Sequence, residues 1–288
     1  MGWAVNEGEC RMPSDEDRHL YHRYTWPEMN EAIGRQPVVL LPIGSTEDHG
    51  HHLPLDVDQF LVETVCREAG RRAPEKILVM PTINYGFNLH HFDFPGTIHI
   101  AGETLINFLV DVCKSVAYHG FRKIVIVNGH GSNAPFTEIA ARRATMETES
   151  LVASVMYPDL GMETYRAIRE SHYPGGAGHA CELETSLYLH LAPERVQMDK
   201  ALDDDTPQGK YIYVDLAGSG PVKMMDWWGR WSETGIIGEA TIATEEKGRT
   251  LFESFVENMV GFVDEFQAWP IAERKDQHTH PVQSSIRW

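Results

Sequence analysis

The stretch Val38-Val39-Leu40-Leu41-Pro42-Ile43-Gly44 decides the fold, together with Ile124-Val125-Ile126-Val127-Asn128-Gly129 later in the chain. Each is a short, continuous apolar run that ends in a loop signal, and such a run predicts a buried strand. Residues 77–80 and 152–156 form two further runs of this kind. Strands that are apolar on both faces are typical of a parallel sheet covered by helices on each side.

Amphipathic segments alternate with these strands. Apolar residues recur at helical spacing over residues 105–117, where Gly120 follows as a stop signal, and over residues 252–266, where Thr244 is a candidate N-cap. The alternation predicts an α/β fold, as a single three-layer α/β/α domain with a mainly parallel central sheet. We expect this domain to span residues 19–267, with terminal arms at residues 1–18 and 268–288.

Composition narrows the classes of function. Asp and Glu number 42 against 25 Lys and Arg, and the resulting net charge of −17 repels phosphate backbones and anionic membranes. No apolar run approaches the roughly 20 residues of a membrane span. We therefore expect a small-molecule substrate and no nucleic-acid or membrane partner. The four cysteines are far apart and the N-terminus lacks a signal-peptide pattern, so we expect reduced thiols and a cytoplasmic location.

The first candidate site follows the strand predicted at residues 38–41. Ligands of open α/β sheets bind at the carboxyl ends of the strands. The loop there reads Gly44-Ser-Thr-Glu-Asp-His-Gly-His-His-Leu-Pro-Leu-Asp-Val-Asp58. Glu47, His49 and His51 alternate, so an extended loop would project them to one side. Carboxylates and imidazoles are ligands of Zn²⁺ and Mn²⁺, and the loop therefore predicts a metal site.

Other members of this loop have less certain roles. Asp56 and Asp58 follow closely enough to complete the metal site. A solvated polar loop is the alternative interpretation, and Asp48 and His51 are the residues that we expect to face solvent.

The second candidate site is Asn128-Gly129-His130-Gly131-Ser132-Asn133, after the strand at residues 124–127. Its two glycines allow the backbone to approach a ligand closely. A phosphate-binding loop is the rival interpretation, but no Lys-Ser/Thr pair follows at the required spacing. We expect His130 to be a metal ligand.

A third candidate site is the predicted helix that begins near His179. Ala180, Leu183 and Leu187 form an apolar stripe, and Glu184 lies on that stripe. A carboxylate there is costly unless a cation pairs with it, so Glu184 is the functional candidate. Glu182 lies on the more polar face and we expect it to be solvated, although the sequence leaves open which of the two glutamates binds metal.

Two further segments carry aromatic and imidazole groups. His90 and His91 follow the strand at residues 77–80, and either contact the substrate or support the ligands, or are ordinary loop histidines. Trp227, Trp228 and Trp231 either supply an aromatic wall to the site or belong to the core or to a subunit interface, with an interface slightly favoured. The candidates that we retain for contact with the substrate or for support of the ligands are His52, His91, Ser132, Asn133 and Trp228.

The ordered motifs resemble those of the creatininase (creatinine amidohydrolase) family. The loop at residues 44–58 resembles the family's opening motif. Later motifs follow in order, as Phe94-Pro-Gly-Thr97, Asn128-Gly-His-Gly-Ser-Asn133 and His179-Ala-Cys-Glu-Leu-Glu-Thr-Ser186, with a C-terminal signature from Ser232-Glu-Thr-Gly-Ile-Ile-Gly238 to Glu246-Lys-Gly248. The resemblance covers about residues 38–260. It implies a homo-oligomeric α/β/α enzyme, a hexamer by family resemblance, with two divalent metal ions per subunit, Zn²⁺ or Mn²⁺.

The resemblance also implies roles for individual residues. Glu47 and His49 would each bind one metal, Asp58 would bridge both, and His130 would be a further ligand. Creatininase has a glutamate at the position of Ser132, so the last carboxylate would come from Glu184 instead. His179 aligns with the histidine proposed to carry the proton, which makes His179 and Glu184 the catalytic candidates. His52 and Asn133 are expected to orient the ligands.

The implied function is metal-dependent hydrolysis of a small polar substrate. A cyclic amide or another non-peptide C–N bond is the main expectation. Creatinine itself is doubtful, because Val155 and Gly175 stand where creatininase has the tryptophans that close over creatinine. Hydrolytic ring opening of a cyclic polyol ketone, as by a dehydro-inosose hydrolase, is one alternative. A non-catalytic, metal-binding oligomeric scaffold is the other.

Overall fold

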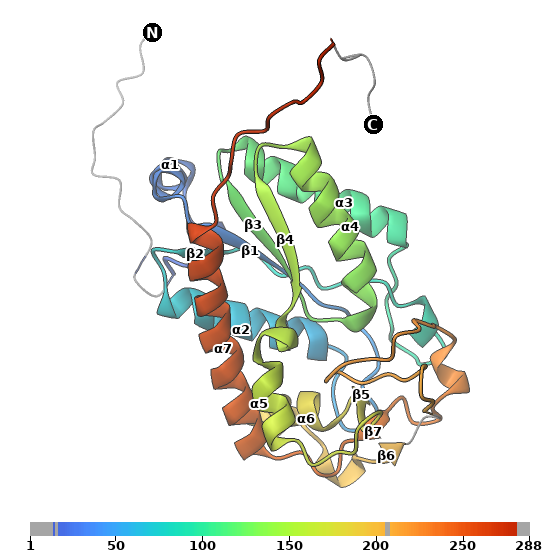
Figure 1. Ribbon diagram of the computed structural model, residues 1–288. Helices are drawn as coiled ribbons and strands as arrows, with labels where there is room; N and C mark the ends of the chain where they lie inside the picture. The colour runs from blue at the N-terminus through green and yellow to red at the C-terminus, as the bar shows by residue number, and fades with distance from the viewer. Residues whose placement is uncertain (1–13, 15–16, 205–207, 281–288) are drawn as a thin grey trace.

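The computed structural model describes residue 14, residues 17–204 and residues 208–280 (Figure 1). The helices are α1 (Trp26–Arg35), α2 (Val57–Arg72), α3 (Gly102–Tyr118), α4 (Ala134–Glu147), α5 (Met162–Ile168), α6 (Glu182–Leu191) and α7 (Glu245–Ala268). The strands are β1 (Val38–Ile43), β2 (Ile77–Val79), β3 (Lys123–Asn128), β4 (Leu151–Met156), β5 (Ala177–His179), β6 (Asp203–Asp204) and β7 (Ile237–Glu239).

The main sheet has four parallel strands in the order β2-β1-β3-β4. All four are the strands predicted from the apolar runs, so the α/β fold with a parallel sheet is confirmed. The chain places β2 on one side of β1 and β3 on the other. The strand order therefore reverses between β1 and β3, and a ligand site is expected beyond the carboxyl ends of these two strands.

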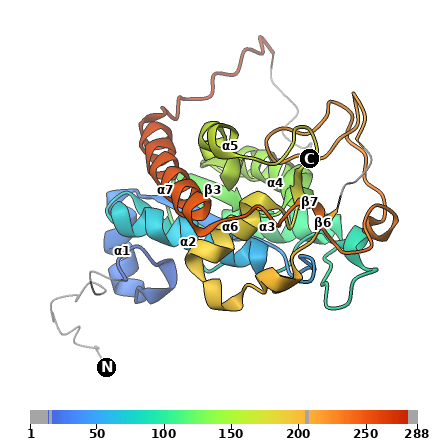
Figure 2. The same cartoon turned by 90° about the horizontal axis from the view of Figure 1, so that it is seen from below.

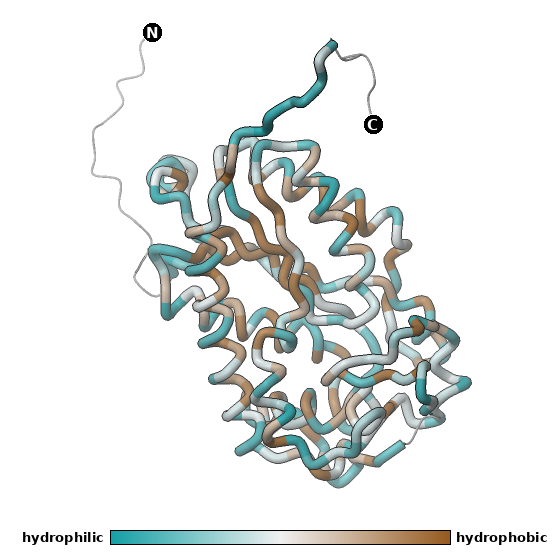
Figure 3. Tube along the Cα trace, viewed as in Figure 1, coloured by the Kyte–Doolittle hydropathy of each residue, from teal (hydrophilic) through white to brown (hydrophobic). Residues whose placement is uncertain are grey.

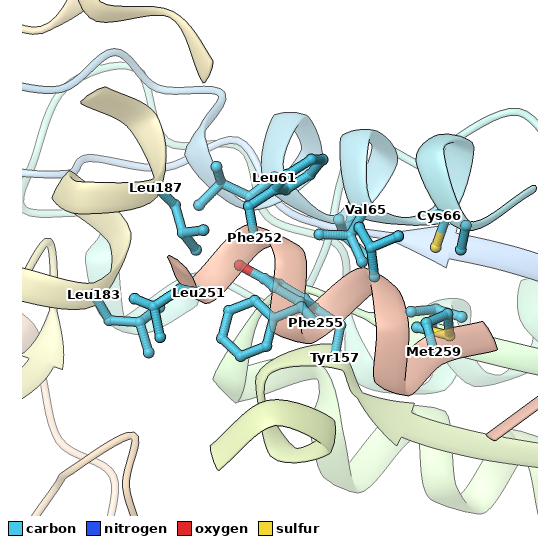
Figure 4. Packing of buried hydrophobic residues seen from close by; sticks show 14 of the residues in the cluster. Leu61, Val65, Cys66, Tyr157, Leu183, Leu187, Leu251, Phe252, Phe255 and Met259 are labelled. Carbon is cyan, nitrogen blue, oxygen red and sulfur yellow. The ribbon is translucent and has the colours of Figure 1, made fainter. Parts of the chain in front are cut away.

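Helices cover both faces of this sheet. Alternate residues of β1 enter opposite cores: Leu40 packs with the apolar sides of α2 and α7, whereas Leu41 packs with α3 and α4. Figure 4 shows the first core, to which Leu61 of α2 and Phe255 of α7 both belong. In Figure 3 the central strands are hydrophobic, whereas the segment after α7 is hydrophilic. The arrangement is the expected three-layer sandwich.

The predicted helix signals act where the sequence indicates. Helix α3 ends at Tyr118, and Gly120 follows with a φ of 104°, which glycine adopts without a Cβ penalty. Thr244 caps α7, because its side-chain oxygen accepts a hydrogen bond from the Lys247 backbone N–H at 3.2 Å.

A small antiparallel sheet, in the order β5-β7-β6, has no counterpart in the sequence prediction. Its strands have only two or three residues, so they carry no alternating pattern. The sheet lies with α5 and α6 beyond the carboxyl ends of β1, β3 and β4 (Figure 1), and Figure 2 looks onto this end of the molecule. It holds His179 at the end of β5.

The structure describes only part of the two predicted terminal arms. Helix α7 ends at Ala268, and residues 269–280 form neither helix nor strand and are exposed. Residues 1–13, 15–16 and 281–288 of the predicted arms lie outside the described residues, so the domain limits stay predictions. Among the helices that the structure describes, none has both the length and the apolar character to cross a bilayer.

Candidate metal centre

The first turn of α2 packs against the ends of two neighbouring strands. The Gly129 N–H donates to the carbonyl of Ile43 at 2.8 Å, which joins the loops that leave β1 and β3. A Cβ on Gly44 would lie 2.3 Å from the backbone nitrogen of Gln59, and one on Gly129 would lie 2.6 Å from the Asp58 carbonyl oxygen. Only glycine permits so close an approach, and that approach brings the Asp58 side chain between the two loops.

Four predicted ligands meet there. The His130 Nδ1 lies 3.2 Å from Glu47 Oε1 and 3.2 Å from Asp58 Oδ2. The other Asp58 oxygen, Oδ1, lies 3.5 Å from His49 Nε2. All four side chains are 5% exposed or less. His130 also donates from Nε2 to the carbonyl of Phe87 at 3.2 Å, which leaves Nδ1 free to bind a metal.

A second group of donor atoms lies beside the first. His49, His179 and Glu184 offer donor atoms within 4.8 Å of one another, as do Glu47, His49 and Asp58. Glu184 is 9% exposed, and it reaches this group from the first turn of α6. The structure therefore brings all five predicted ligands, Glu47, His49, Asp58, His130 and Glu184, to one end of the sheet.

The residues fit divalent cations. Among the buried side-chain atoms of the described residues that lack a hydrogen-bond partner are Glu47 Oε1, His49 Nε2, Asp58 Oδ2 and Glu184 Oε2. Buried polar atoms are normally paired, and unpaired ones cost free energy. A mixed set of imidazole nitrogens and carboxylate oxygens is the donor set that Zn²⁺ and Mn²⁺ use.

The pKa values of the donor groups also indicate that these groups need positive charge beside them. Burial raises the pKa of Glu184 to about 7, against the opposing effect of His49, and burial with the Asp58 charge raises that of Glu47. Burial opposes a charge on His49, but Asp58 outweighs it and raises the pKa of His49 to about 10. In the same way the pKa of His130 is raised well above its ordinary value by Glu47 and Asp58. Without metal, protons hold the place of the cations.

Asp48 does not face solvent, so the prediction for this residue was wrong. It is 7% exposed, and its Oδ1 accepts a hydrogen bond from His91 Nδ1 at 2.8 Å. Its backbone carbonyl accepts from His179 Nε2 at 2.8 Å.

Gly50, with a φ of 66°, turns the chain, so that His51 is exposed and does not share the side of Glu47 and His49. The prediction that His51 faces solvent is therefore confirmed. The prediction that His51 projects to the same side as Glu47 and His49 is wrong.

Glu182 does not face solvent either. It is 1% exposed and accepts a hydrogen bond from Lys247 Nζ at 2.6 Å. It also accepts from the backbone N–H groups of Glu170 and Ser171, at 3.0 and 3.1 Å. These bonds satisfy its oxygens, so Glu182 ties α6 to α7, whereas Glu184 faces the donor atoms of the site.

Trp228 covers the imidazole groups. Its ring stacks on His91, with centroids 4.7 Å apart, and its edge meets His179 at 5.7 Å. It is 7% exposed, so it lies inside this chain and not on a subunit interface. Trp231 packs against it at 5.4 Å, whereas Trp227 is 40% exposed.

The remaining candidates support loops around the site. Asn133 accepts from the Phe87 N–H at 2.9 Å and donates to the Gly44 carbonyl at 3.0 Å, which fixes two of the loops. Ser132 bonds to His90 Nε2 at 2.9 Å. His52 bonds to Thr185 on α6 at 2.8 Å, and Asp56 accepts from the Tyr188 hydroxyl, also at 2.8 Å.

Sequence reasoning missed two supports of the ligands. Ser45 donates to Glu47 Oε2 at 3.1 Å and itself receives a hydrogen bond from Asn88. The Phe87 carbonyl that holds His130 is a backbone atom, for which no side-chain pattern exists. The sequence offered one signal for such a support, which is the position of Ser45 two residues before Glu47 in the candidate metal-binding loop.

Comparisons with known proteins agree with this geometry. The family model of creatininase, described as creatinine amidohydrolase, matches residues 22–263. The chain is 32% identical over 242 residues to a mycofactocin precursor peptide peptidase of Mycobacterium tuberculosis (81% of this chain, 87% of the relative). It is 30% identical to a creatinine amidohydrolase of Pseudomonas putida (84% and 94%). It is 26% identical to a 3-dehydro-scyllo-inosose hydrolase of Thermotoga maritima (82% and 80%).

Solved structures of creatininase share the fold. A manganese creatininase superposes with a TM-score of 0.75 at 27% identity, covering 86% of this chain and 98% of the other. A Zn–Zn creatininase variant has a TM-score of 0.74 at 27% identity and covers 85% and 97%. A variant complexed with creatine has a TM-score of 0.74 at 28% identity and covers 86% and 98%.

Fold and site together define a protein of the α/β class with a buried cluster of imidazole and carboxylate groups that fits divalent cations. The chain belongs to the creatininase family. It is accordingly a metal-dependent hydrolase of the amidohydrolase type, a family whose solved structures hold Zn–Zn or Mn.

Proposed function

We propose that this chain binds two divalent ions, Zn²⁺ or Mn²⁺, and hydrolyses a C–N bond in a small polar substrate, a cyclic amide or another non-peptide amide other than creatinine. One observation carries the proposal. Four buried donor atoms that lack hydrogen-bond partners, Glu47 Oε1, His49 Nε2, Asp58 Oδ2 and Glu184 Oε2, belong to side chains that meet at one end of the sheet.

The ligands divide into two sets that share Asp58. One set is Glu47, Asp58 and His130, and the other is His49, Asp58 and Glu184. The two oxygens of Asp58 support this division, because Oδ2 lies beside His130 and Oδ1 lies beside His49. A carboxylate with one oxygen toward each set is suited to bridge two ions.

When bound, a pair of such ions lowers the pKa of a water molecule and polarises the substrate carbonyl. The chain's own contribution is to place a proton carrier beside the scissile bond. The His179 Nδ1 lies 3.8 Å from Glu47 Oε1, on the side covered by Trp228. We assign to His179 Nδ1 the transfer of a proton from the attacking water to the leaving nitrogen, a step that contributes roughly 10²–10⁴ in rate.

A small substrate is favoured over a peptide or creatinine. The donor side chains are 9% exposed or less, and Trp228 lies over their imidazole neighbours, which supports a small substrate in preference to a polypeptide. Val155 and Gly175 cannot supply the aromatic walls that the family resemblance associates with creatinine. Trp228, from a different segment, supplies an aromatic surface instead.

Ring opening of a cyclic polyol ketone is the second candidate. The relative from Thermotoga maritima is a 3-dehydro-scyllo-inosose hydrolase, and the match covers 82% of this chain. A two-metal site that polarises a carbonyl serves this substrate as well as an amide.

Elemental analysis followed by a hydrolase screen tests the proposal. The purified protein is expected to contain about two Zn²⁺ or Mn²⁺ per chain, and a panel of cyclic amides, formamides and inosose-type ketones is expected to yield one substrate. Release of an acid together with an amine or ammonia supports the amide, and an acid alone supports the ring ketone. The panel also includes a short peptide. Bound metal without turnover of any compound in the panel would leave only the non-catalytic scaffold as the function.

Asp58→Ala tests the shared ligand. We expect it to lose both ions and all turnover, because each ligand set contains Asp58. Full metal content and activity in Asp58→Ala would overturn the assignment. Asp56→Ala, two residues away and hydrogen-bonded to Tyr188 instead, is the matched control that is expected to keep both ions.

A further inference from the structure

One residue, Asp48, fixes two imidazole rings on the covered side of the site. Its carboxylate Oδ1 accepts from His91 Nδ1, and its backbone carbonyl accepts from His179 Nε2, both at 2.8 Å. Asp48 lies between the candidate ligands Glu47 and His49, yet its side chain points to His91. Asp48 therefore contacts the proposed proton carrier and a second histidine, His91, which the proposed reaction does not yet use.

These hydrogen bonds decide which nitrogen of each neutral ring carries the hydrogen. Beside an ionised Asp48 the carboxylate and carbonyl oxygens only accept, so His91 carries its hydrogen on Nδ1 and His179 carries it on Nε2. The two remaining nitrogens, His91 Nε2 and His179 Nδ1, are then bare lone pairs. Each lies 3.8 Å from Glu47 Oε1.

The result is a cluster of three hydrogen-bond acceptors. The lone-pair atoms of Glu47, His91 and His179 all lie within 4.8 Å of one another, so they can face one common ligand. Aromatic packing holds the rings in place, because Trp228 stacks on His91 at an interplanar angle of 30° and meets His179 edge-on at 87°. His91 is 1% exposed, so water does not readily compensate for a missing partner.

We propose that Asp48 is a positioning residue, and that the acceptor cluster of Glu47, His91 and His179 binds an N–H or O–H group of the substrate next to the reacting carbonyl. The substrate class follows from the cluster's chemistry: an amide with a free N–H, or a ketone with a neighbouring hydroxyl. Tertiary amides, which have no N–H, and esters lack the hydrogen that this cluster needs. The statement about substrate rests on the proposed function, whereas the placement of the two hydrogens does not.

A third cation bound by Glu47, His91 and His179 is the competing occupant, because the same lone pairs bind metals. Metal analysis separates the two, since the proposal requires that His91→Gln retain the wild-type metal content. Loss of one ion per chain in His91→Gln would overturn the proposal in favour of a third metal.

Imidazole ¹⁵N spectra of the zinc-loaded enzyme test the tautomers without any substrate. We expect His91 in the Nδ1–H form and His179 in the Nε2–H form, assigned by the signals that vanish in His91→Gln and His179→Gln. An Nε2–H form of His91 would overturn the proposal even if the enzyme is active. The predicted tautomers in a protein without turnover would instead count against the proposed function alone.

Asp48→Ala tests the positioning role by kinetics. With a substrate found in the screen, kcat/KM is expected to fall about 10- to 100-fold, chiefly through KM, at unchanged zinc content. When every amide N–H of that substrate is methylated, the wild type is expected to turn it over as poorly as Asp48→Ala turns over the parent substrate. Asp48→Ala is expected to lose nothing further on the methylated form. Asp111→Ala, at an exposed aspartate of α3, is the control that keeps wild-type values. A folded, zinc-loaded Asp48→Ala with wild-type kcat/KM contradicts the proposal, and if this variant does not fold, the tautomers of the wild type decide.

Discussion

Two glutamates two residues apart have opposite environments at the start of α6. Glu182 has a cation and two backbone N–H groups as partners, and Lys247 Nζ lies 2.6 Å from its Oε1. Glu184 has an oxygen without a partner and lies with His49 and His179. Burial is nearly equal for both, so the partners, and not the exposure, separate a structural carboxylate from a candidate ligand.

Glu184→Gln and Glu182→Gln are expected to fail in different ways. Glu184→Gln removes a charged ligand, so the metal content should fall from about two ions per chain to about one, with little change in stability in the presence of chelator. Glu182→Gln should retain both ions but lose about 1–3 kcal/mol of unfolding free energy, because Lys247 then keeps only the exposed Glu170, 3.3 Å away, as a countercharge. Elemental analysis and urea unfolding measure the two effects.

The two variants serve as controls for each other. If Glu182→Gln loses metal while Glu184→Gln retains it, the assignment of the last ligand is reversed.

Helical spacing could predict the side of α6 on which Glu184 lies, but not the partners of Glu182. Lys247 is 65 residues away in sequence, and the backbone groups of residues 170 and 171 belong to a loop without a pattern. Asp48 was misplaced for the same reason, because its partner His91 comes from another loop. Local patterns predict which face a residue occupies, whereas long-range pairs depend on the completed fold.

At the scale of elements, the position of α2 determines the centre. Its first turn touches the ends of both β1 and β3, and Asp58 enters the site from that turn. The two glycines at these strand ends are therefore as necessary to the site as the ligands.

Gly129→Ala tests this contact between elements. The added Cβ would lie 2.6 Å from the Asp58 carbonyl oxygen and 3.0 Å from the Val62 side chain, so α2 must shift. We expect a loss of about 1–3 kcal/mol in unfolding free energy together with weaker metal binding. Gly131→Ala, two residues later, has no heavy atom within 4 Å of the new Cβ and is expected to match the wild type. Equal stability and metal affinity for both variants would refute the role of the contact.

The elements themselves were predictable to different degrees. The four strands of the main sheet, α3 and α7 have long or fully apolar patterns, and all of them were predicted. The strands β5, β6 and β7 have no such pattern, since pairing alone makes them strands. For that reason the loops after β1 and β3 were placed correctly at strand ends, whereas the strand that holds His179, β5, was not predicted.

At the scale of the whole molecule, metal and protons compete for the same buried groups. In the metal-free protein the pKa of His49 is raised to about 10 and that of Glu184 to about 7. A raised pKa contributes stability below the unfolded-state pKa and loses it as pH rises through the folded-state pKa. From these groups the metal-free protein therefore loses stability as pH rises.

Bound metal is expected to remove this loss, because it takes the place of the protons. The difference in melting temperature between zinc-loaded and chelator-treated protein should thus grow from about pH 6 to about pH 9. Asp58→Asn, which lacks the shared ligand, should show no such difference at any pH. A difference that is constant with pH in the wild type would contradict the exchange of protons for metal.

The assembly is the last prediction at this scale. The family resemblance implies a hexamer, and several apolar side chains of residues 222–227 are exposed in the single chain, with Met224 and Met225 about half exposed. Light scattering is expected to give about six times the chain mass of 32.6 kDa. A monomer at micromolar concentration would contradict the expectation.

The candidate metal ligands and the aromatic cover come from separate parts of the chain. The ligands lie on β1, β3, α2 and α6 or directly beside them, whereas Trp228 lies in a segment between β6 and β7 that belongs to neither apolar core. Side chains of residues 222–231 can therefore change without a cost to the two apolar cores, whereas the buried Ser232 hydroxyl holds Asp204 of β6 and the backbone of Ile236. Evolution within this architecture can exchange one substrate for another while the hydrolytic centre is inherited intact, and a laboratory library confined to residues 222–231 would exploit the same freedom.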